Sequence, residues 1–237
     1  ASTMAAAIVT KKQAITLAHI AAGTRSFDIT MPKEINRLVI DGLSDILFTA
    51  GFSNNSIANK EGAELSKVYM VGNILIDNIR YNRERVEGMR LNDIDTLAGL
   101  PLKEGSYIVF TLNRKALLAD QENLEKMLRV LCETAGDLPI IAPLRDSAVQ
   151  VIMALGLKKN ISLHNLHIIK PLNYLQFAYL TSHAQGIVTD SGNVAEEATF
   201  NNIPCITLNS YTEHIETVKV GSNVLVGEDA ELLRSAF

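Results

Sequence analysis

The feature that most constrains this chain is the alternation of short apolar runs with longer amphipathic segments. Runs such as Tyr107–Thr111 and Gly186–Thr189 predict buried strands, and residues 120–135 have helical spacing. Strands that are apolar throughout and separated by helices are typical of a parallel sheet covered on both faces. The sequence therefore predicts an α/β protein. Further strands are expected at Pro139–Pro143, His167–Ile169, Cys205–Leu208 and Val224–Val226, and further helices near residues 146–156, 174–183, 193–200 and 213–220.

The first 78 residues are poorer in strands. They predict an opening helix, a short strand at Ile15–Ile20, a helix from Pro32 to about Phe48 and a buried strand at Val68–Val71. A polar stretch, residues 79 to about 103, follows and is expected to link two units. A Rossmann-type unit normally opens on a strand and has five or six of them. We therefore expect the first unit to be incomplete or to rely on another chain.

Composition excludes several classes of partner. The formal net charge is -4, aromatic residues make up 5% and there is no Trp, which argues against nucleic-acid binding. No apolar run reaches the ~18 residues of a membrane span. Cys132 and Cys205 lie in apolar runs without metal-ligand spacing, so both are expected to be free and buried. A cytoplasmic protein that binds neither nucleic acid nor membrane is expected.

The most informative segment runs from Ile187 to Ala198 (IVTDSGNVAEEA). A buried strand leads through Thr-Asp-Ser-Gly directly into a helix, whose free N–H groups and dipole favour an anion. Gly192 would let a phosphate approach the backbone, and Glu197 could accept hydrogen bonds from ribose hydroxyls. The alternative is an ordinary capped helix, with Ser191 as its N-cap and two glutamates complementing the dipole.

A second polar segment, Asn209 to His214 (NSYTEH), follows the strand Cys205–Leu208. It lies at the carboxyl end of a neighbouring strand, where open α/β sheets bind ligands. The alternative is a strand-to-helix loop in which Thr212 caps a helix and Glu213 lies in its first turn.

Together these segments resemble the non-hydrolysing UDP-N-acetylglucosamine 2-epimerases. Residues 186–227 are similar to the family pattern TDSGG-x-x-EE, G-x-P, TERP-E-x-V and G-x-x-x-LVG. Upstream, in the family's order, the matching segments are His19–Arg25 (H-x-E-A-G-x-R), Pro32–Arg37 (P-E-E-x-N-R), Val71–Asp77 (V-G-N-x-x-I-D), Thr111–Arg114 (T-x-H-R) and Pro171–Tyr174 (P-L-x-Y).

The resemblance implies a glycosyltransferase-B-like fold with two Rossmann-like parallel-sheet domains. Residues 1–78 would be a partial N-terminal domain, and residues 79–237 a C-terminal nucleotide-sugar-binding domain without its last helices. The family interconverts UDP-GlcNAc and UDP-ManNAc for surface polysaccharides, by elimination of UDP and its re-addition. The implied partners are UDP or a UDP-N-acetylhexosamine and a second copy in a homodimer. No metal or other cofactor is implied.

The chain departs from the family at its proton-transfer positions. By the resemblance these fall on Ala21, Lys33 and Asn113, where the family has Glu, Glu and His. Alanine cannot transfer a proton, an amide does not titrate, and lysine acts as a base only with a strongly lowered pKa.

The expected substrate-binding positions are partly altered as well. Asn193 replaces a glycine, while Asn209 and His214 replace arginines, which removes bidentate phosphate contacts. The substrate-binding set implied by the resemblance is Ser191, Gly192, Asn193, Glu197, Arg114, Asn209 and His214. Glu196, Thr212, Glu213, Arg25, Asn36 and Arg37 also match the family.

Three hypotheses follow. The chain is an epimerase homologue with impaired catalysis that still binds a UDP-sugar, or a working epimerase that uses His19, Lys33 or Glu34 instead. The third is a non-catalytic regulatory or structural partner of an active epimerase, because an incomplete first domain leaves strand edges to be covered.

Overall fold

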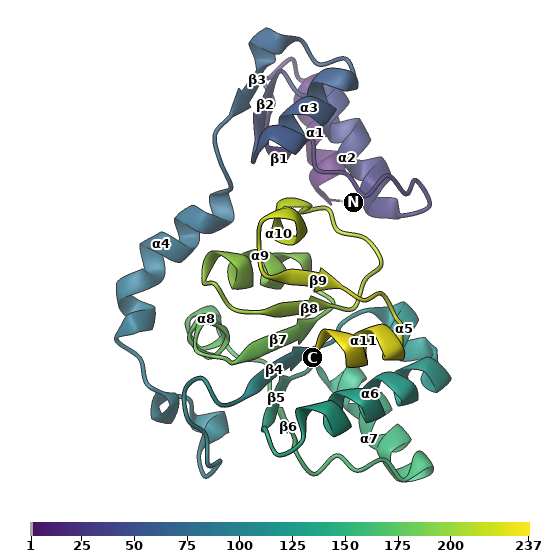
Figure 1. Ribbon diagram of the computed structural model, residues 1–237. Coiled ribbons are helices and arrows are strands. Elements are labelled where there is room, and N and C mark those ends of the chain that lie inside the picture. Colours follow the sequence, from purple (N-terminus) through teal and green to yellow (C-terminus); the bar gives the residue numbers. More distant parts are fainter. Residues whose placement is uncertain (1) are drawn as a thin grey trace. The chain divides into compact units, whose positions relative to one another are not determined.

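A computed structural model describes residues 2–237, and the chain divides into two compact units, Ala1–Asn78 and Ile79–Phe237. Each unit is built on a parallel sheet, and each is described by itself below (Figure 1).

The second unit contains a six-stranded sheet with the order β6-β5-β4-β7-β8-β9. All neighbouring pairs are parallel. The chain leaves β4 first toward β5 and β6 and later adds β7, β8 and β9 on the other side of β4, so the strand order reverses between β4 and β7. The strands are β4 (Ile108–Thr111), β5 (Ile140–Pro143), β6 (Leu166–Ile169), β7 (Gly186–Thr189), β8 (Cys205–Thr207) and β9 (Asn223–Leu225).

Helices cover both faces of this sheet (Figure 1). Alternate residues of β4 point to opposite faces: Ile108 and Phe110 join one apolar cluster, and Val109 joins the other. The first cluster is packed by α6 (Gln121–Ala135), α7 (Asp146–Lys159) and α11 (Ala230–Ala236), and the second by α8 (Tyr174–Ser182) and α9 (Gly192–Phe200). The remaining helices are α4 (Ile74–Glu87), which crosses the boundary between the units, α5 (Lys115–Ala119) and α10 (Glu216–Lys219).

The first unit contains a three-stranded parallel sheet with the order β1-β2-β3. Its buried cluster is small and consists of Ala22, Leu47 and Ala58. Ile20, Phe48 and Tyr69 are register partners across the three strands, and Ile20 and Tyr69 are half exposed, at 56% and 50%. The elements are α1 (Ser2–Lys12), β1 (Ala18–Ala22), α2 (Pro32–Leu43), β2 (Ile46–Thr49), α3 (Phe52–Lys60) and β3 (Val68–Met70).

Two expectations for this unit were wrong. The helix predicted from Pro32 to about Phe48 ends at Leu43, where Ser44 is extended and its N–H bonds to the carbonyl of Asp41, and β2 follows at once. The strand at Val68–Val71 forms but is not buried, because Tyr69 and Met70 are exposed. The first strand begins three residues later than predicted and continues to Ala22.

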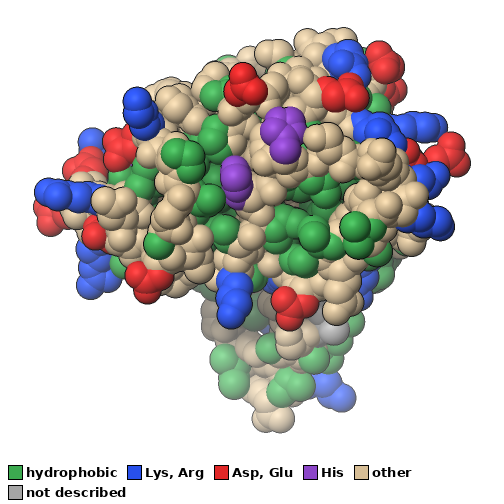
Figure 2. All heavy atoms as spheres, turned by 90° about the horizontal axis from the view of Figure 1, so that it is seen from below, with side chains coloured by type: hydrophobic (Ala, Val, Ile, Leu, Met, Phe, Trp, Pro, Cys, Tyr) green, Lys and Arg blue, Asp and Glu red, His purple; other side chains and the backbone are tan. Residues whose placement is uncertain are grey.

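The expected strands of the second unit agree with the structure to within one residue at each end. Cys132 and Cys205 are buried and free, as predicted. On the face shown in Figure 2, Lys and Arg side chains are mixed with Asp and Glu around the edge, and hydrophobic and histidine side chains lie between them. Within residues 2–237, no helix combines the length and the hydropathy that crossing a bilayer requires.

Candidate functional site

The candidate site lies where the strand order reverses, at the carboxyl ends of β4 and β7. In parallel α/β sheets this reversal opens a crevice that commonly holds a ligand. The two strands are in register there, with Thr111 opposite Thr189. Their buried hydroxyls are 2.6 Å apart and form a hydrogen bond. This bond fixes the spacing of the two loops that leave the strands.

Asp190 ties these two loops together. Its Oδ2 accepts hydrogen bonds from the backbone N–H groups of Asn113, at 2.7 Å, and Arg114, at 2.5 Å. Its Oδ1 is buried and has no hydrogen-bond partner among the described residues. Burial raises the pKa of the Asp190 carboxyl in spite of the amide donors. Asp190 therefore orients the loop that carries Asn113, and its own carboxylate faces away from bulk water.

The loop after β7 opens directly into α9. Ser191 occupies the N-cap position, but its side chain does not cap the helix, and its N–H instead bonds to the hydroxyl of Thr189 at 3.0 Å. The simple capping role considered for Ser191 is therefore absent. Gly192 and the exposed Asn193 form the first turn. An N-terminus that no side chain caps keeps donors and a positive dipole for an anion.

Glu197 lies further along α9 and is only 8% exposed. Burial, and after it the neighbouring charge of Glu196, raises the pKa of Glu197 to about 7. The side chain lines a cavity of about 530 Å³ whose other walls include Arg80, Tyr174 and Phe200. A buried carboxyl beside a cavity is suited to bind hydroxyl groups of a ligand, because either protonation state can form hydrogen bonds with them.

Arg114 is held on the same edge of the sheet by two partners. Its Nη1 donates to Oδ1 of Asn209 at 2.9 Å and lies 3.0 Å from a carboxylate oxygen of Glu228. The amide nitrogen of Asn209 donates in turn to the carbonyl of Asp190, at 3.1 Å. The segments after β4, β7, β8 and β9 are thus linked by hydrogen bonds and an ion pair.

His214 packs on the first turn of α9. A Cβ added to Gly192 would lie 3.0 Å from Cδ2 and 3.3 Å from Nε2 of the imidazole. The Nδ1 atom is 2.9 Å from Oε1 of Glu196, and the backbone N–H of His214 bonds to the hydroxyl of Thr212. Thr212 therefore caps a turn, not a helix, because α10 begins only at Glu216.

The structure brings most of the predicted residues of the second unit to one edge of the sheet: Ser191, Gly192, Asn193, Arg114, Asn209, His214 and Asn113. Glu197 lies further along α9, beside the cavity formed with α4 and α8. The sequence analysis did not identify Glu196 as the partner of His214 or Glu228 as the partner of Arg114. Glu228 could have been found, since it follows β9 at the same end of the sheet as the other loops.

Ala21 and Lys33 belong to the first unit. Ala21 lies at an irregularity of β1, where the register shifts between Ile20 and Ala22, and it has a left-handed backbone with a φ of 64°. Its side chain carries no group that titrates. Lys33 is exposed at the start of α2, beside the buried Glu34.

The loop that follows Ala21 is held by buried charges. Asp41 accepts from the backbone N–H of Gly23 at 3.0 Å and from Arg25 at 2.6 Å, and lies 2.5 Å from Nδ1 of His19. Arg25, which is 3% exposed, also binds Glu61. Burial alone would raise the pKa of Asp41, but the bonds from His19, Gly23 and Arg25 hold it below its usual range.

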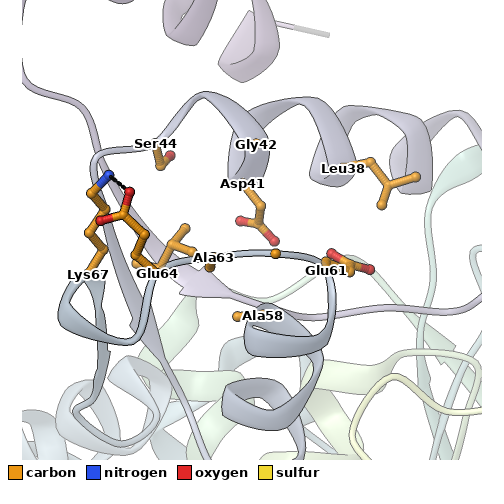
Figure 3. Close-up of a pocket in the computed structure, with 11 residues that line it drawn as sticks. Leu38, Asp41, Gly42, Ser44, Ala58, Glu61, Ala63, Glu64 and Lys67 are labelled. Carbon is orange, nitrogen blue, oxygen red and sulfur yellow. Dashed lines mark hydrogen bonds and ion pairs between the residues drawn. The ribbon is translucent and has the colours of Figure 1, made fainter.

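Asp41 and Glu61 also line a pocket of about 450 Å³ (Figure 3), where both carboxylates point into the space between α2 and α3. Glu34 anchors the other end of the loop by accepting from the N–H groups of Ser26 and Phe27. The loop conformation therefore rests on Asp41, Arg25 and Glu34.

Comparison with known proteins gives a consistent result. A family model described as UDP-N-acetylglucosamine 2-epimerase matches residues 1–237. A protein of Methanococcus maripaludis named UDP-N-acetylglucosamine 2-epimerase homolog is 36% identical, over 97% of this chain and 63% of its own length. A UDP-2,3-diacetamido-2,3-dideoxy-D-glucuronate 2-epimerase of Pseudomonas aeruginosa is 34% identical, over 98% of this chain and 62% of its own length.

The solved structure of Methanocaldococcus jannaschii UDP-GlcNAc 2-epimerase in complex with UDP-GlcNAc and UDP is similar, with 34% identity and a TM-score of 0.85. The match covers 99% of this chain and 64% of that one. The chain therefore spans less than two thirds of the length of these relatives. Its fold is α/β and glycosyltransferase-B-like, with a parallel sheet in each unit.

Proposed function

The chain belongs to the UDP-N-acetylglucosamine 2-epimerase family, and on that premise we propose that it binds a UDP-linked 2-acetamido sugar but epimerises it poorly or not at all. The observation that carries the proposal is that residues suited to bind the ligand are retained while residues suited to transfer protons are replaced. The uncapped turn at Gly192 and the buried Glu197 remain at the end of β7, while Ala21 and Asn113 stand at proton-transfer positions.

The binding half of the proposal is supported by the geometry of the second unit. A diphosphate placed at the N-terminus of α9 would meet backbone donors and the dipole of the helix. Glu197 lies on the same helix, and its carboxyl lines a cavity between α4, α8 and α9 where hydroxyl groups of a ligand could reach it. The relative from Methanocaldococcus jannaschii was solved with UDP and UDP-GlcNAc, which favours this class of ligand.

The impairment half rests on the chemistry of three side chains. Epimerisation at C2 requires removal and return of a proton by groups that titrate in the working range. The methyl group of Ala21 and the amide of Asn113 do not transfer protons, and Lys33 lies exposed at the start of α2. The two buried carboxylates at this loop already accept hydrogen bonds: Asp41 from Arg25 and Gly23, and Glu34 from the amides of Ser26 and Phe27.

Calorimetric titration of the purified chain with UDP tests the binding half. Saturable binding that is weakened at least ~10-fold by Glu197→Ala is expected, because a pair of hydrogen bonds to a carboxylate is worth more than about 1.4 kcal/mol. Glu122→Ala is the matched control, since Glu122 is an exposed glutamate on α6. Absence of binding at millimolar UDP would overturn this half of the proposal.

Incubation with UDP-GlcNAc, followed by separation of the gluco and manno epimers, tests the impairment half. We expect no manno product, or a rate lower by several orders of magnitude than that of an active relative, because general acid–base groups typically contribute 10²–10⁴-fold each. Turnover at a rate typical of the family would show that His19, Lys33 or Glu34 has taken over proton transfer.

The second candidate function is assembly with another chain, either an active epimerase or a second copy of this chain. It is favoured by the half-exposed Ile20 and Tyr69, which flank Phe48 on the sheet of the first unit, because parallel sheets are normally covered on both faces. Size-exclusion chromatography with light scattering, alone and with an active homologue, tests it. A monomer in both experiments would exclude this role.

A further inference from the structure

His214 is the side chain that covers the proposed anion site. Its Cδ2 lies 3.0 Å from the position of a Cβ on Gly192, so the ring rests on the turn that opens α9. It is held there by the carboxylate of Glu196 at 2.9 Å and by the turn that its N–H closes with Thr212. An anion that approaches the N-terminus of α9 therefore meets this imidazole first.

The guanidinium of Arg114, which is hydrogen-bonded to the segment that carries His214, is itself paired with a carboxylate. Arg114 lies 3.0 Å from Glu228 and donates to Asn209. His214 is paired with the carboxylate of Glu196. When the imidazole is neutral, this pair carries a net negative charge beside the first turn of α9. The other charged side chains on the surrounding elements are Glu197 on α9, Asp190 after β7, Glu213 in its own segment, and Glu216 and Lys219 on α10.

A diphosphate diester is fully ionised over the whole range in which imidazole titrates. Next to a neutral His214 it would be repelled by the unpaired charge of the Glu196 carboxylate, whereas a protonated ring would supply the positive charge that the family resemblance assigns to an arginine here. The ligand therefore favours the protonated ring, and by linkage the protonated ring favours the ligand.

We propose that binding of a UDP-sugar to this chain takes up a proton at His214, so that affinity falls as the pH rises through the titration of histidine; this rests on the proposed binding function. Uptake of one proton changes the affinity for the UDP-sugar by at most ~10-fold for each pH unit. We expect the affinity to fall toward this limit as the pH rises and the ring of the free protein loses its proton. The contact made by His214 thus responds to pH, whereas an arginine at this position would keep its charge.

The test is calorimetric titration of the full chain with UDP-GlcNAc at about pH 6 and about pH 8, in two buffers with different heats of ionisation. The sugar nucleotide is used in place of UDP because the terminal phosphate of UDP itself titrates near this range. The difference in apparent enthalpy between the buffers reports the number of protons taken up. We expect uptake approaching one proton and a loss of affinity on the order of 10-fold or more at the higher pH.

His214→Arg is the decisive variant. A permanent charge should preserve binding at the lower pH and abolish both the proton uptake and the pH dependence. Glu197→Gln provides the second comparison, because Glu197 also titrates near neutrality. His167→Gln, on the edge strand β6, controls for replacement of a histidine elsewhere.

The possible results distinguish a failure of this inference from a failure of the proposed function. Proton uptake that persists in His214→Arg, or that disappears only in Glu197→Gln, would overturn the assignment to His214. Binding with no pH dependence would overturn the inference and leave the proposed function intact. Absence of binding by the wild type and by His214→Arg at both pH values would overturn the proposed function and this inference with it.

Discussion

At the scale of single residues, the candidate site depends on charges that sequence alone could not pair. The predicted residues Arg114, Asn209 and His214 do meet at one edge of the sheet. That Arg114 lies beside Glu228, and His214 beside Glu196, depends on rotamers and on contacts between separate loops. No spacing rule gives such contacts, because the partners of Arg114 are more than ninety residues away in the sequence.

Glu197 gives a stability prediction with a defined sign. Its folded-state pKa of about 7 lies above the ordinary value of 4.5, so the folded protein retains a proton that the unfolded chain releases. Stability therefore falls as the pH rises from about 4.5 to about 7, by at most about 3 kcal/mol. Glu197→Gln removes this loss, and we expect the variant to be more stable than the wild type at pH 8 and equal to it near pH 4.5.

Urea denaturation at several pH values measures this effect. Glu122→Gln, at an exposed site on α6, should show no such dependence. A difference between Glu197→Gln and the wild type that stays constant with pH would contradict the prediction. Confirmation would mean that the protein tolerates a destabilising group where we propose that the ligand binds.

At the scale of elements, the sequence predicted the strands of the second unit well and the first unit less well. Continuous apolar runs flanked by polar turns identify buried parallel strands, because side chains on both faces of such a sheet are covered. In the first unit, Ile46 and Leu47 continue the helical spacing of α2, and a short apolar run cannot be told from a helix by periodicity. The strand β2 begins there because Ser44 turns extended and Asp45 binds the backbone N–H of Leu17 and the side chain of Lys11.

Two glycines of the first unit give a matched pair of substitutions. Gly23 has a φ of 70°, and a Cβ there would lie 2.2 Å from the carbonyl oxygen of Asn54. Gly23→Ala is therefore expected to destabilise the first unit by more than about 2 kcal/mol. Gly42 lies in the last turn of α2 with nothing within 4 Å, so Gly42→Ala should stabilise it by roughly 0.5–1 kcal/mol.

Thermal or urea unfolding followed by the fluorescence of a probe placed in the first unit measures both changes. Equal effects of the two alanines, or a neutral Gly23→Ala, would show that the loop after β1 can relax away from Asn54. Such a loop would not be held by Asp41 and Arg25 in the way described above.

At the scale of the whole molecule, the two units differ in how much apolar surface they bury. In the second unit, two large clusters cover both faces of the sheet. In the first unit, the corresponding cluster contains only Ala22, Leu47 and Ala58, with Ala63 and Val68 packed against it. Since burial of apolar area is the main favourable term in folding, the first unit is expected to be the less stable.

Hydrogen exchange followed by mass spectrometry tests this difference. Amides of β1, β2 and β3 should exchange at lower opening free energies than those of β4, β5 and β7, and the denaturation curve should contain more than one transition. Equal protection in both sheets, lost in a single transition, would show that the units unfold as one. Addition of UDP should slow exchange in the second unit if the proposed site is occupied.

The left-handed backbone of Ala21 has a consequence for substitutions at this position. Such a conformation costs a non-glycine residue on the order of 1–3 kcal/mol and persists only where its surroundings impose it. Those surroundings, the hydroxyl of Thr24 on its carbonyl and Asp41 on Gly23, do not involve the side chain at position 21. The single substitution Ala21→Glu would therefore place a carboxylate in a loop that already has its present shape. A titratable side chain at position 21 would thus require no change in the backbone of this loop.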